Sequence, residues 1–212
     1  MRIALLGASG PTGQQVLDQA VTASHEVVAL VRREGSVVAR DGVTVTVADV
    51  TSSDDLSTVF RDVDVVISCL GAPYSWKPIT VYSDATRAII DAMRAASIRR
   101  LVVVSAGMTH PIRQGGVTWQ KPVYTILRNG PGRTLYADMR RMEDMLAGAH
   151  DLDWTIMRPT RLTDEVRAND QVQRTPGLPE GRGMTTRQDL AAAILAEIAD
   201  PHTHEGVFVT TR

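Results

Sequence analysis

The hydrophobic positions of this chain follow two alternating patterns. Short runs that are apolar at nearly every position predict buried strands, and segments with apolar residues three or four positions apart predict helices that pack by one face. The runs predict strands at residues 1–6, 25–31, 43–47, 63–68, 101–104, 154–157 and 207–209. The spaced segments predict a helix after the first strand and further helices at residues 53–61, 80–96, 134–149 and 187–198.

This order of elements predicts an α/β fold with one doubly wound parallel sheet and helices on both faces. Ligands on such a sheet bind outside the carboxyl ends of the strands. Two long connections, about residues 106–133 and 160–185, follow such strand ends, and we expect them to form walls or a lid for a substrate. For the first connection, a dimer contact through Trp119 and Tyr124 is the competing interpretation.

Three glycines stand where the first predicted strand meets the first helix. Gly7 suits the tight bend, Gly10 lets a diphosphate approach the backbone, and Gly13 lets the helix pack against the strand. A turn of this kind places an anion at the positive end of the helix, beside unpaired backbone N–H groups. The spacing favours dinucleotide binding, and a turn that serves packing alone is the alternative.

The other residues of this turn fit the same role. Pro11 suits the first helical turn because its missing N–H is not needed there. The hydroxyls of Ser9 and Thr12 can donate hydrogen bonds to phosphate oxygens.

The second predicted strand ends at two arginines rather than at a carboxylate. A dinucleotide fold presents this strand end to the adenosine ribose, where a carboxylate favours NAD. A guanidinium pairs instead with a 2'-phosphate and keeps its charge. We therefore expect NADP(H) to be preferred over NAD(H), with Arg32 as the main contact and Arg33 as the second. Two solvated arginines are the alternative, and the neighbouring Glu34 weakens the argument.

Composition narrows the class of partner. The 212 residues are 43% hydrophobic and 22% charged, with a net charge of −1, which is ordinary for a globular protein and disfavours nucleic-acid or membrane binding. We expect a cytoplasmic monomer or homodimer with a small-molecule substrate. Cys69 is the one cysteine and lies in an apolar run, so it is expected in the core. His202 and His204 lack further ligands nearby, so we expect them at the surface and predict no metal site.

Six short motifs occur in a characteristic order. They are residues 7–13, Val31-Arg32, Ala48-Asp49-Val50, Leu70-Gly71, Val104-Ser105-Ala106 and residues 155–159. In this order they resemble the atypical short-chain dehydrogenase/reductases, and in particular the NAD(P)H-binding group that contains biliverdin-IX-beta reductase, also called flavin reductase, and NmrA-like proteins. The resemblance covers essentially the whole chain and implies a single NAD(P)-binding Rossmann domain over residues 1–212.

The resemblance also implies contacts for the cofactor. Asp49, with Val50 beside it, would accept a hydrogen bond from the adenine amino group, although capping a turn is its alternative role. Leu70 and Gly71 would line the adenosine and its ribose. The backbone that follows Pro159 could hold the nicotinamide carboxamide.

Ser105 ends the fifth predicted strand, opposite the nicotinamide that the resemblance implies. Its hydroxyl could donate to a carbonyl or ring nitrogen of the acceptor as the hydride arrives. A serine that closes the strand by bonding its own backbone is the alternative.

Many such relatives carry a Tyr-x-x-x-Lys pair that protonates the substrate. The two lysines of this chain, Lys77 and Lys121, have no tyrosine four residues before them, so the pair is absent. The nearest substitute is Tyr136 with Arg140, which share a helix face. If Tyr136 does not donate the proton, solvent would.

These residues together favour an NADPH-dependent reductase that passes hydride to a flat conjugated acceptor such as a flavin, biliverdin or a quinone. A redox sensor that binds NADP without turnover is the alternative from another class. A sugar-nucleotide epimerase or dehydratase is less favoured, because the Tyr-x-x-x-Lys pair is missing.

Overall fold

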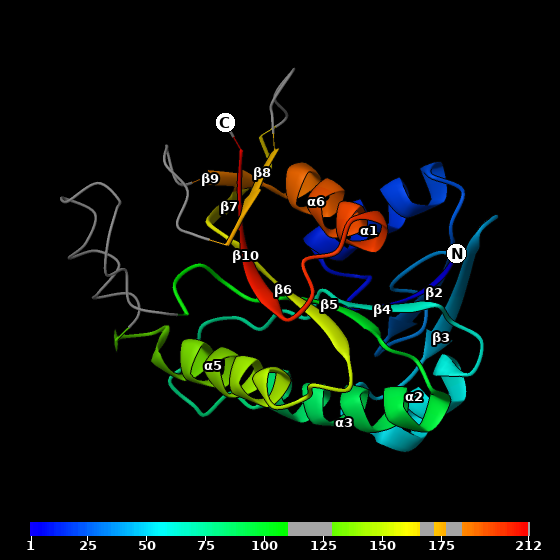
Figure 1. Ribbon diagram of the computed structural model, residues 1–212, viewed down its shortest axis with the longest axis horizontal. Coiled ribbons are helices and arrows are strands. Elements are labelled where there is room, and N and C mark those ends of the chain that lie inside the picture. The colour runs from blue at the N-terminus through cyan, green and yellow to red at the C-terminus, as the bar shows by residue number, and fades with distance from the viewer. Residues whose placement is uncertain (110–128, 166–171, 177–183, 212) are drawn as a thin grey trace.

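The computed structural model describes residues 1–109, 129–165, 172–176 and 184–211. In these residues a twisted sheet lies between two layers of helices (Figure 1). The strands of the main sheet are, in spatial order, β3 (Val43–Val47), β2 (Glu26–Val31), β1 (Arg2–Leu6), β4 (Val65–Ser68), β5 (Arg100–Val104), β6 (Asp153–Pro159), β10 (Glu205–Thr211) and β8 (Val172–Thr175). All neighbours are parallel except β10 and β8, and the winding direction reverses between β1 and β4.

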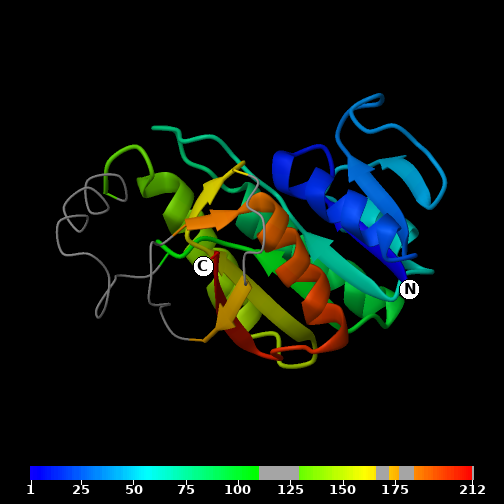
Figure 2. The same cartoon turned by 90° about the horizontal axis from the view of Figure 1, so that it is seen from above.

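The helices divide between the two faces of the sheet. The helices α1 (Pro11–Thr22) and α6 (Arg187–Ala199) cover one face, and α2 (Ser53–Phe60), α3 (Val81–Ala96) and α5 (Arg133–Ala147) cover the other. Figure 2 shows α1 and α6 side by side, and the Gln19 side chain of α1 donates to the Gln188 carbonyl of α6 across 2.9 Å. This confirms the expected doubly wound fold.

The central strands are buried on both sides because helices cover both faces of the sheet. In β1, Ala4 and Leu6 belong to the core under α2, α3 and α5, whereas Ile3 and Leu5 belong to the core under α1 and α6. This explains why the strands are continuous apolar runs rather than alternating ones.

The carboxyl ends of the strands are aligned along one edge. Leu6 at the end of β1 is level with Leu30 in β2 and with Ser68 in β4, and Val104 of β5 is level with Met157 of β6. The turn after β1 therefore lies between the connections that leave β2 and β4.

The connection at residues 160–185 contains strands that the apolar pattern does not predict. It contains the short strands β7 (Arg161–Thr163), which pairs with β9 (Met184–Thr186), and β8, which pairs with β10. Their residues are largely polar and half-buried, so the sequence has no apolar run to mark them. The other long connection lies outside the described residues at 110–128, which include Trp119 and Tyr124.

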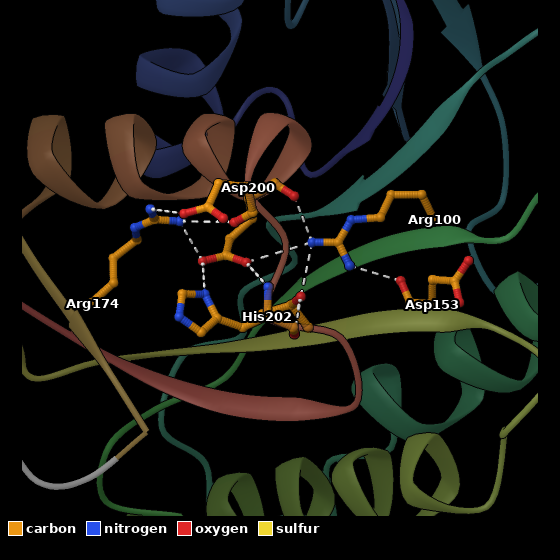
Figure 3. A network of polar contacts seen from close by, with 7 residues as sticks. Arg100, Asp153, Arg174, Asp200 and His202 are labelled. Carbon is orange, nitrogen blue, oxygen red and sulfur yellow. Dashed lines mark hydrogen bonds and ion pairs between the residues drawn. The ribbon is translucent and has the colours of Figure 1, made fainter.

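A buried ion network lies at the opposite end of the sheet, where β5 and β6 begin (Figure 3). The Glu197 carboxylate is fully buried and accepts a hydrogen bond from Arg174 Nη1 at 2.7 Å. It also binds Nδ1 of His202 at 2.9 Å and the backbone N–H of His202 at 2.8 Å, and Arg100 lies 3.6 Å away. His202 thus keeps a partly exposed ring, 29% of its side chain being accessible, and also contributes to the hydrogen bonds of the buried Glu197 carboxylate, which the sequence does not reveal.

Candidate cofactor and active site

The three glycines of the first turn meet different surroundings. Gly7 has a φ of +77°, and a Cβ added there would lie 2.5 Å from the Cys69 carbonyl oxygen. A Cβ on Gly13 would lie 2.1 Å from the Gly7 carbonyl oxygen, so this glycine lets α1 pack directly on the turn. A Cβ on Gly10 would meet one neighbouring atom, at 3.3 Å. Gly7 and Gly13 are thus required by the fold, whereas Gly10 leaves space above the backbone.

The amino end of α1 is open to an anion. Gly10 caps the helix without a side-chain hydrogen bond, Pro11 is its first residue, and no acidic residue stands in its first turn. Ser9 is exposed and Thr12 half-buried at the same end. Among the described residues no side chain occupies the N–H groups that a phosphate would bind.

Arg32 and Arg33 follow the carboxyl end of β2, next to this turn, and both side chains are exposed. Neither has an ion pair or a side-chain hydrogen bond within the described ranges. Their guanidinium groups therefore remain available to an anionic ligand.

Asp49 follows β3 and serves the turn in which it stands. Its Oδ1 accepts from the backbone N–H of Thr51 at 2.9 Å and from the Thr51 hydroxyl at 2.7 Å, and these bonds lower the pKa of the Asp49 carboxyl. Asp49 is exposed, and its Oδ2 has no hydrogen bond in the part of the chain that is described. The capping role is thus present, and one oxygen is left that can accept from an adenine. Val50 beside it is buried in the core.

Leu70 and Gly71 follow β4 on the other side of the glycine turn. Leu70 is half-buried and packs on the core, and Gly71 is exposed. A Cβ added to Gly71 would meet nothing within 4 Å, so the protein itself does not require a glycine there. This openness leaves space in which a ligand can lie.

Ser105, at the end of β5, is buried and bonded to two side chains. Its hydroxyl donates to Oε1 of Glu143 in α5 across 2.5 Å and lies 3.0 Å from the Thr109 hydroxyl. Oε2 of Glu143 accepts from Nη2 of Arg158, in β6, at 2.6 Å. The arrangement joins β5, α5 and β6 through one buried carboxylate. The single proton of Ser105 is directed to Glu143 rather than to the site of an acceptor.

The backbone around Pro159 is already bonded within the protein. The Pro159 carbonyl accepts from the Gly107 N–H at 2.9 Å, and the Thr160 N–H donates to the Thr185 hydroxyl at 3.0 Å and to the Val209 carbonyl at 3.3 Å. These groups can meet a nicotinamide carboxamide only by sharing or exchanging these bonds.

Tyr136 and Arg140 share one face of α5 but bind different partners. The Tyr136 hydroxyl shares a hydrogen bond with the Tyr74 hydroxyl at 2.9 Å, and Arg140 donates to the Thr109 carbonyl at 3.2 Å. Burial, helped by the bond to Tyr74, raises the pKa of the Tyr136 phenol well above its ordinary value of 10.0. A Tyr-Lys pair works by lowering that pKa, so Tyr136 here holds its proton more tightly than such a pair requires.

Sequence reasoning missed two participants in this site. Glu143 lies seven residues after Tyr136 and is a buried acidic residue on the inward face of α5, which is the signal that could have marked it. Tyr74 stands in the connection between β4 and α3, where no local pattern distinguishes it from an ordinary loop residue.

The described residues contain no group of three or more His, Cys, Asp or Glu side chains that could hold a metal ion. Within the same ranges, no helix has both the length and the apolar character needed to cross a membrane.

An open helix terminus after β1, beside two free guanidinium groups, defines a dinucleotide-binding protein of the doubly wound class. Residues 7–201 match the model of a family described as NAD(P)H-binding, so the chain belongs to that family. Membership of this family accounts for the glycine turn after β1.

Three relatives illustrate the range of activities assigned within this fold. The chain is 25% identical over 218 residues to Bacillus subtilis YhfK, named an uncharacterized sugar epimerase, with 100% of this chain and 94% of that protein covered. The structure of the oxidoreductase YlbE from Lactococcus lactis superimposes with a TM-score of 0.81 at 18% identity, covering 100% of this chain and 91% of that one. A Streptococcus pneumoniae protein provisionally named an NADH-flavin reductase gives a TM-score of 0.75 at 20% identity, with 100% of each chain covered. The two structural similarities establish the fold.

Proposed function

We propose that this protein is an NADPH-dependent reductase that acts on a flat conjugated small molecule such as a flavin, biliverdin or a quinone. The observation that carries the proposal is the open amino end of α1, with the unpartnered Arg32 at the neighbouring strand end. A diphosphate fits the first of these and a 2'-phosphate the second. When bound, a reduced nicotinamide supplies the hydride.

In the proposed cofactor site, backbone groups and side chains bind different parts of the cofactor. The backbone at Gly10 and the first turn of α1 hold the diphosphate, and Ser9 and Thr12 add hydroxyl contacts. Arg32 and Arg33 bind the 2'-phosphate, and Asp49 meets the adenine with its second oxygen.

The raised pKa of Tyr136 favours a conjugated ring as the acceptor. Oxidation of an alcohol, or epimerisation of a sugar, needs a base that takes the hydroxyl proton, and a tyrosine whose pKa is raised by burial stays protonated and is not available for that role. Reduction of a conjugated ring spreads the added charge over the ring, so solvent can supply the proton. Tyr136 therefore supports the reductase over the epimerase named for YhfK, although that relative keeps the epimerase as the second candidate.

Ser105 would lie beside the nicotinamide at the end of β5. Because the Ser105 hydroxyl donates its hydrogen bond to Glu143, its lone pairs are what it can offer to a ligand, and the nicotinamide carboxamide N–H is a fitting donor. Arg140 precedes Glu143 by three residues on α5, which is about one helical turn. Its positive charge stabilises an acceptor that gains negative charge.

The proposal is tested by following NADPH consumption against riboflavin, biliverdin and a soluble quinone, with NADH measured in parallel. Consumption with one acceptor supports a reductase and identifies its substrate class. Under the same conditions, Ser105→Ala is expected to lower turnover about tenfold, because the nicotinamide loses a contact that positions it, while the diphosphate and 2'-phosphate contacts keep most of the NADPH affinity. Binding of NADPH without consumption of any acceptor would favour the redox sensor instead.

A further inference from the structure

We propose that Tyr74 and Trp76 form the surface on which the flat ring of the acceptor stacks. This inference rests on the proposed function, because it names where the conjugated acceptor of that reaction binds. Both residues stand in the connection at residues 69–80, between β4 and α3, and neither belongs to the cofactor contacts described above.

The position of this connection suits an acceptor. It leaves the carboxyl end of β4, which is level with the end of β1 and its glycine turn, and it runs beside the beginning of α5 (Figure 1). An acceptor bound here would lie on the side of the sheet where the cofactor binds.

The connection is fixed on both of its sides. The Thr134 hydroxyl of α5 donates to the Ser75 carbonyl across 2.7 Å, and the Ala72 N–H donates to the Tyr82 hydroxyl of α3 across 3.0 Å. The Tyr74 hydroxyl is held by Tyr136 at 2.9 Å. Three hydrogen bonds to two helices thus set the course of this loop before any ligand binds.

The two aromatic side chains nevertheless face water. Tyr74 is 51% exposed and Trp76 is 80% exposed, although the backbone that carries them is anchored. Large aromatic rings gain free energy when they leave water, and an exposed pair on an ordered loop is typical of a binding surface. Their π-faces can stack on a planar conjugated ring.

The geometry of α5 sets the scale of the site. Tyr136, which holds Tyr74, and Glu143, which holds Ser105, are seven residues apart on one helix, or about 10 Å along its axis. A fused three-ring molecule has comparable length. Such an acceptor could stack on Tyr74 and Trp76 at one end and bring its other end toward the nicotinamide beside Ser105.

The test measures binding of oxidised riboflavin, which carries the ring without a phosphate, through quenching of its own fluorescence. Each sample also contains saturating NADP+, which fills the cofactor site without reducing the ring. The variants are Trp76→Ala, Trp76→Phe, Tyr74→Ala and Tyr74→Phe. Val38→Ala serves as the matched control, because Val38 is also apolar and 78% exposed but lies in the connection after β2.

Stacking on one aromatic residue predicts that Trp76→Ala and Tyr74→Ala each weaken riboflavin binding about tenfold or more. Trp76→Phe should keep most of the affinity because it keeps a ring. Tyr74→Phe should do so as well, since the bonds of Ala72 and Ser75 still hold the loop when the Tyr74 hydroxyl is lost. Val38→Ala should change nothing. NADPH affinity, measured by cofactor fluorescence on the same proteins, should stay constant.

The outcomes separate this inference from the proposed function. If riboflavin binds equally well to the wild type and both alanine variants, the stacking surface is wrong while the reductase can stand. If the wild type binds no riboflavin, the inference is likewise overturned. If the alanine variants lose riboflavin but no NADPH is ever oxidised, the surface stands and the reductase fails. If Trp76→Ala instead abolishes a dimer without affecting riboflavin, a second copy of the chain covers this surface and the inference is overturned.

Discussion

The hydroxyl of Ser105 donates to Oε1 of Glu143 across 2.5 Å, from the end of β5 to the middle of α5. A hydroxyl has one proton to donate and two lone pairs with which to accept. The carboxylate is buried, and the Arg158 guanidinium at 2.6 Å compensates its charge. Ser105 is therefore oriented by a charged group rather than free to rotate toward a ligand.

Removal of this charge should destabilise the protein. Glu143→Gln keeps the volume and an acceptor for Ser105 but removes the negative charge that pairs with the largely buried Arg158 guanidinium. We expect the free energy of unfolding to fall by about 2 to 3 kcal/mol, because removing one charge of a buried ion pair is destabilising. Urea denaturation measures this change. The neighbouring exposed Asp144 supplies the control: Asp144→Asn should stay within about 0.5 kcal/mol, and equal losses in both variants would contradict the account.

Two similar substitutions in the glycine turn should affect different properties, one the stability of the protein and the other its affinity for NADPH. Gly13→Ala places a methyl group against the Gly7 carbonyl and should cost about 3 kcal/mol of stability, because backbone must move. Gly10→Ala should fold normally but weaken NADPH binding about tenfold or more, since its methyl group fills the space that a diphosphate would use. Thermal unfolding and cofactor fluorescence separate the two effects. A Gly10→Ala protein that binds NADPH as tightly as the wild type would place the diphosphate elsewhere.

Arg32 should distinguish the two nicotinamide cofactors. Loss of a charge-assisted hydrogen bond to a phosphate predicts that Arg32→Ala weakens NADPH binding by about tenfold to a hundredfold. NADH lacks the 2'-phosphate, so its affinity should hardly change. Arg33→Ala should show the same selectivity with a smaller loss. The exposed Arg61, after α2, provides a control for general loss of positive charge. Equal losses of NADPH and NADH would contradict a 2'-phosphate contact.

Cys69 should make stability fall in alkaline solution. Burial raises the pKa of its thiol from 9.0 to about 12. The unfolded chain releases this proton above pH 9 while the folded chain keeps it, so the contribution to stability is complete below pH 9 and is lost as the pH rises toward 12. Unfolding measured across this range should show a smaller pH dependence in Cys69→Ala. Part of the slope remains, because burial also raises the pKa values of Tyr82 and Tyr136.

The burial of Cys69 also predicts how its thiol reacts with an alkylating reagent, which can be measured on the wild-type protein. The folded protein should resist iodoacetamide at pH 8, and the urea-unfolded protein should react, because the thiolate is the reactive form. Rapid labelling of the folded protein would show that Cys69 is accessible.

The main features of the fold could be predicted because they are local in the sequence. Continuous apolar runs mark strands that are buried on both faces, and the order of runs and amphipathic segments leads to the doubly wound sheet. The cap of α6 is local as well, since the Thr186 hydroxyl accepts from the Asp189 N–H three residues later. The strands β7, β8 and β9 were missed because they are short and polar, and only their partners in space identify them.

The polar contacts of the site were harder to predict because they join distant parts of the chain. Ser105 and Glu143 are 38 residues apart, and Tyr74 and Tyr136 are 62 residues apart. The sequence indicated that Ser105 and Tyr136 matter, but not which side chains receive their hydroxyl groups. These partners decide whether a hydroxyl can donate to a ligand, so the chemistry of the site depends on tertiary contacts that residue spacing does not reveal.

The central claim is that hydride passes from NADPH to a conjugated ring on this protein. The most direct measurement mixes the protein with NADPH and riboflavin without oxygen and records the nicotinamide and isoalloxazine absorbance bands together. The account predicts that both bands decay at the same rate, that the rate depends on protein concentration, and that Ser105→Ala slows it. If NADPH binds but neither band changes, or if NADPH is lost while the riboflavin band stays constant, hydride transfer to this ring is contradicted.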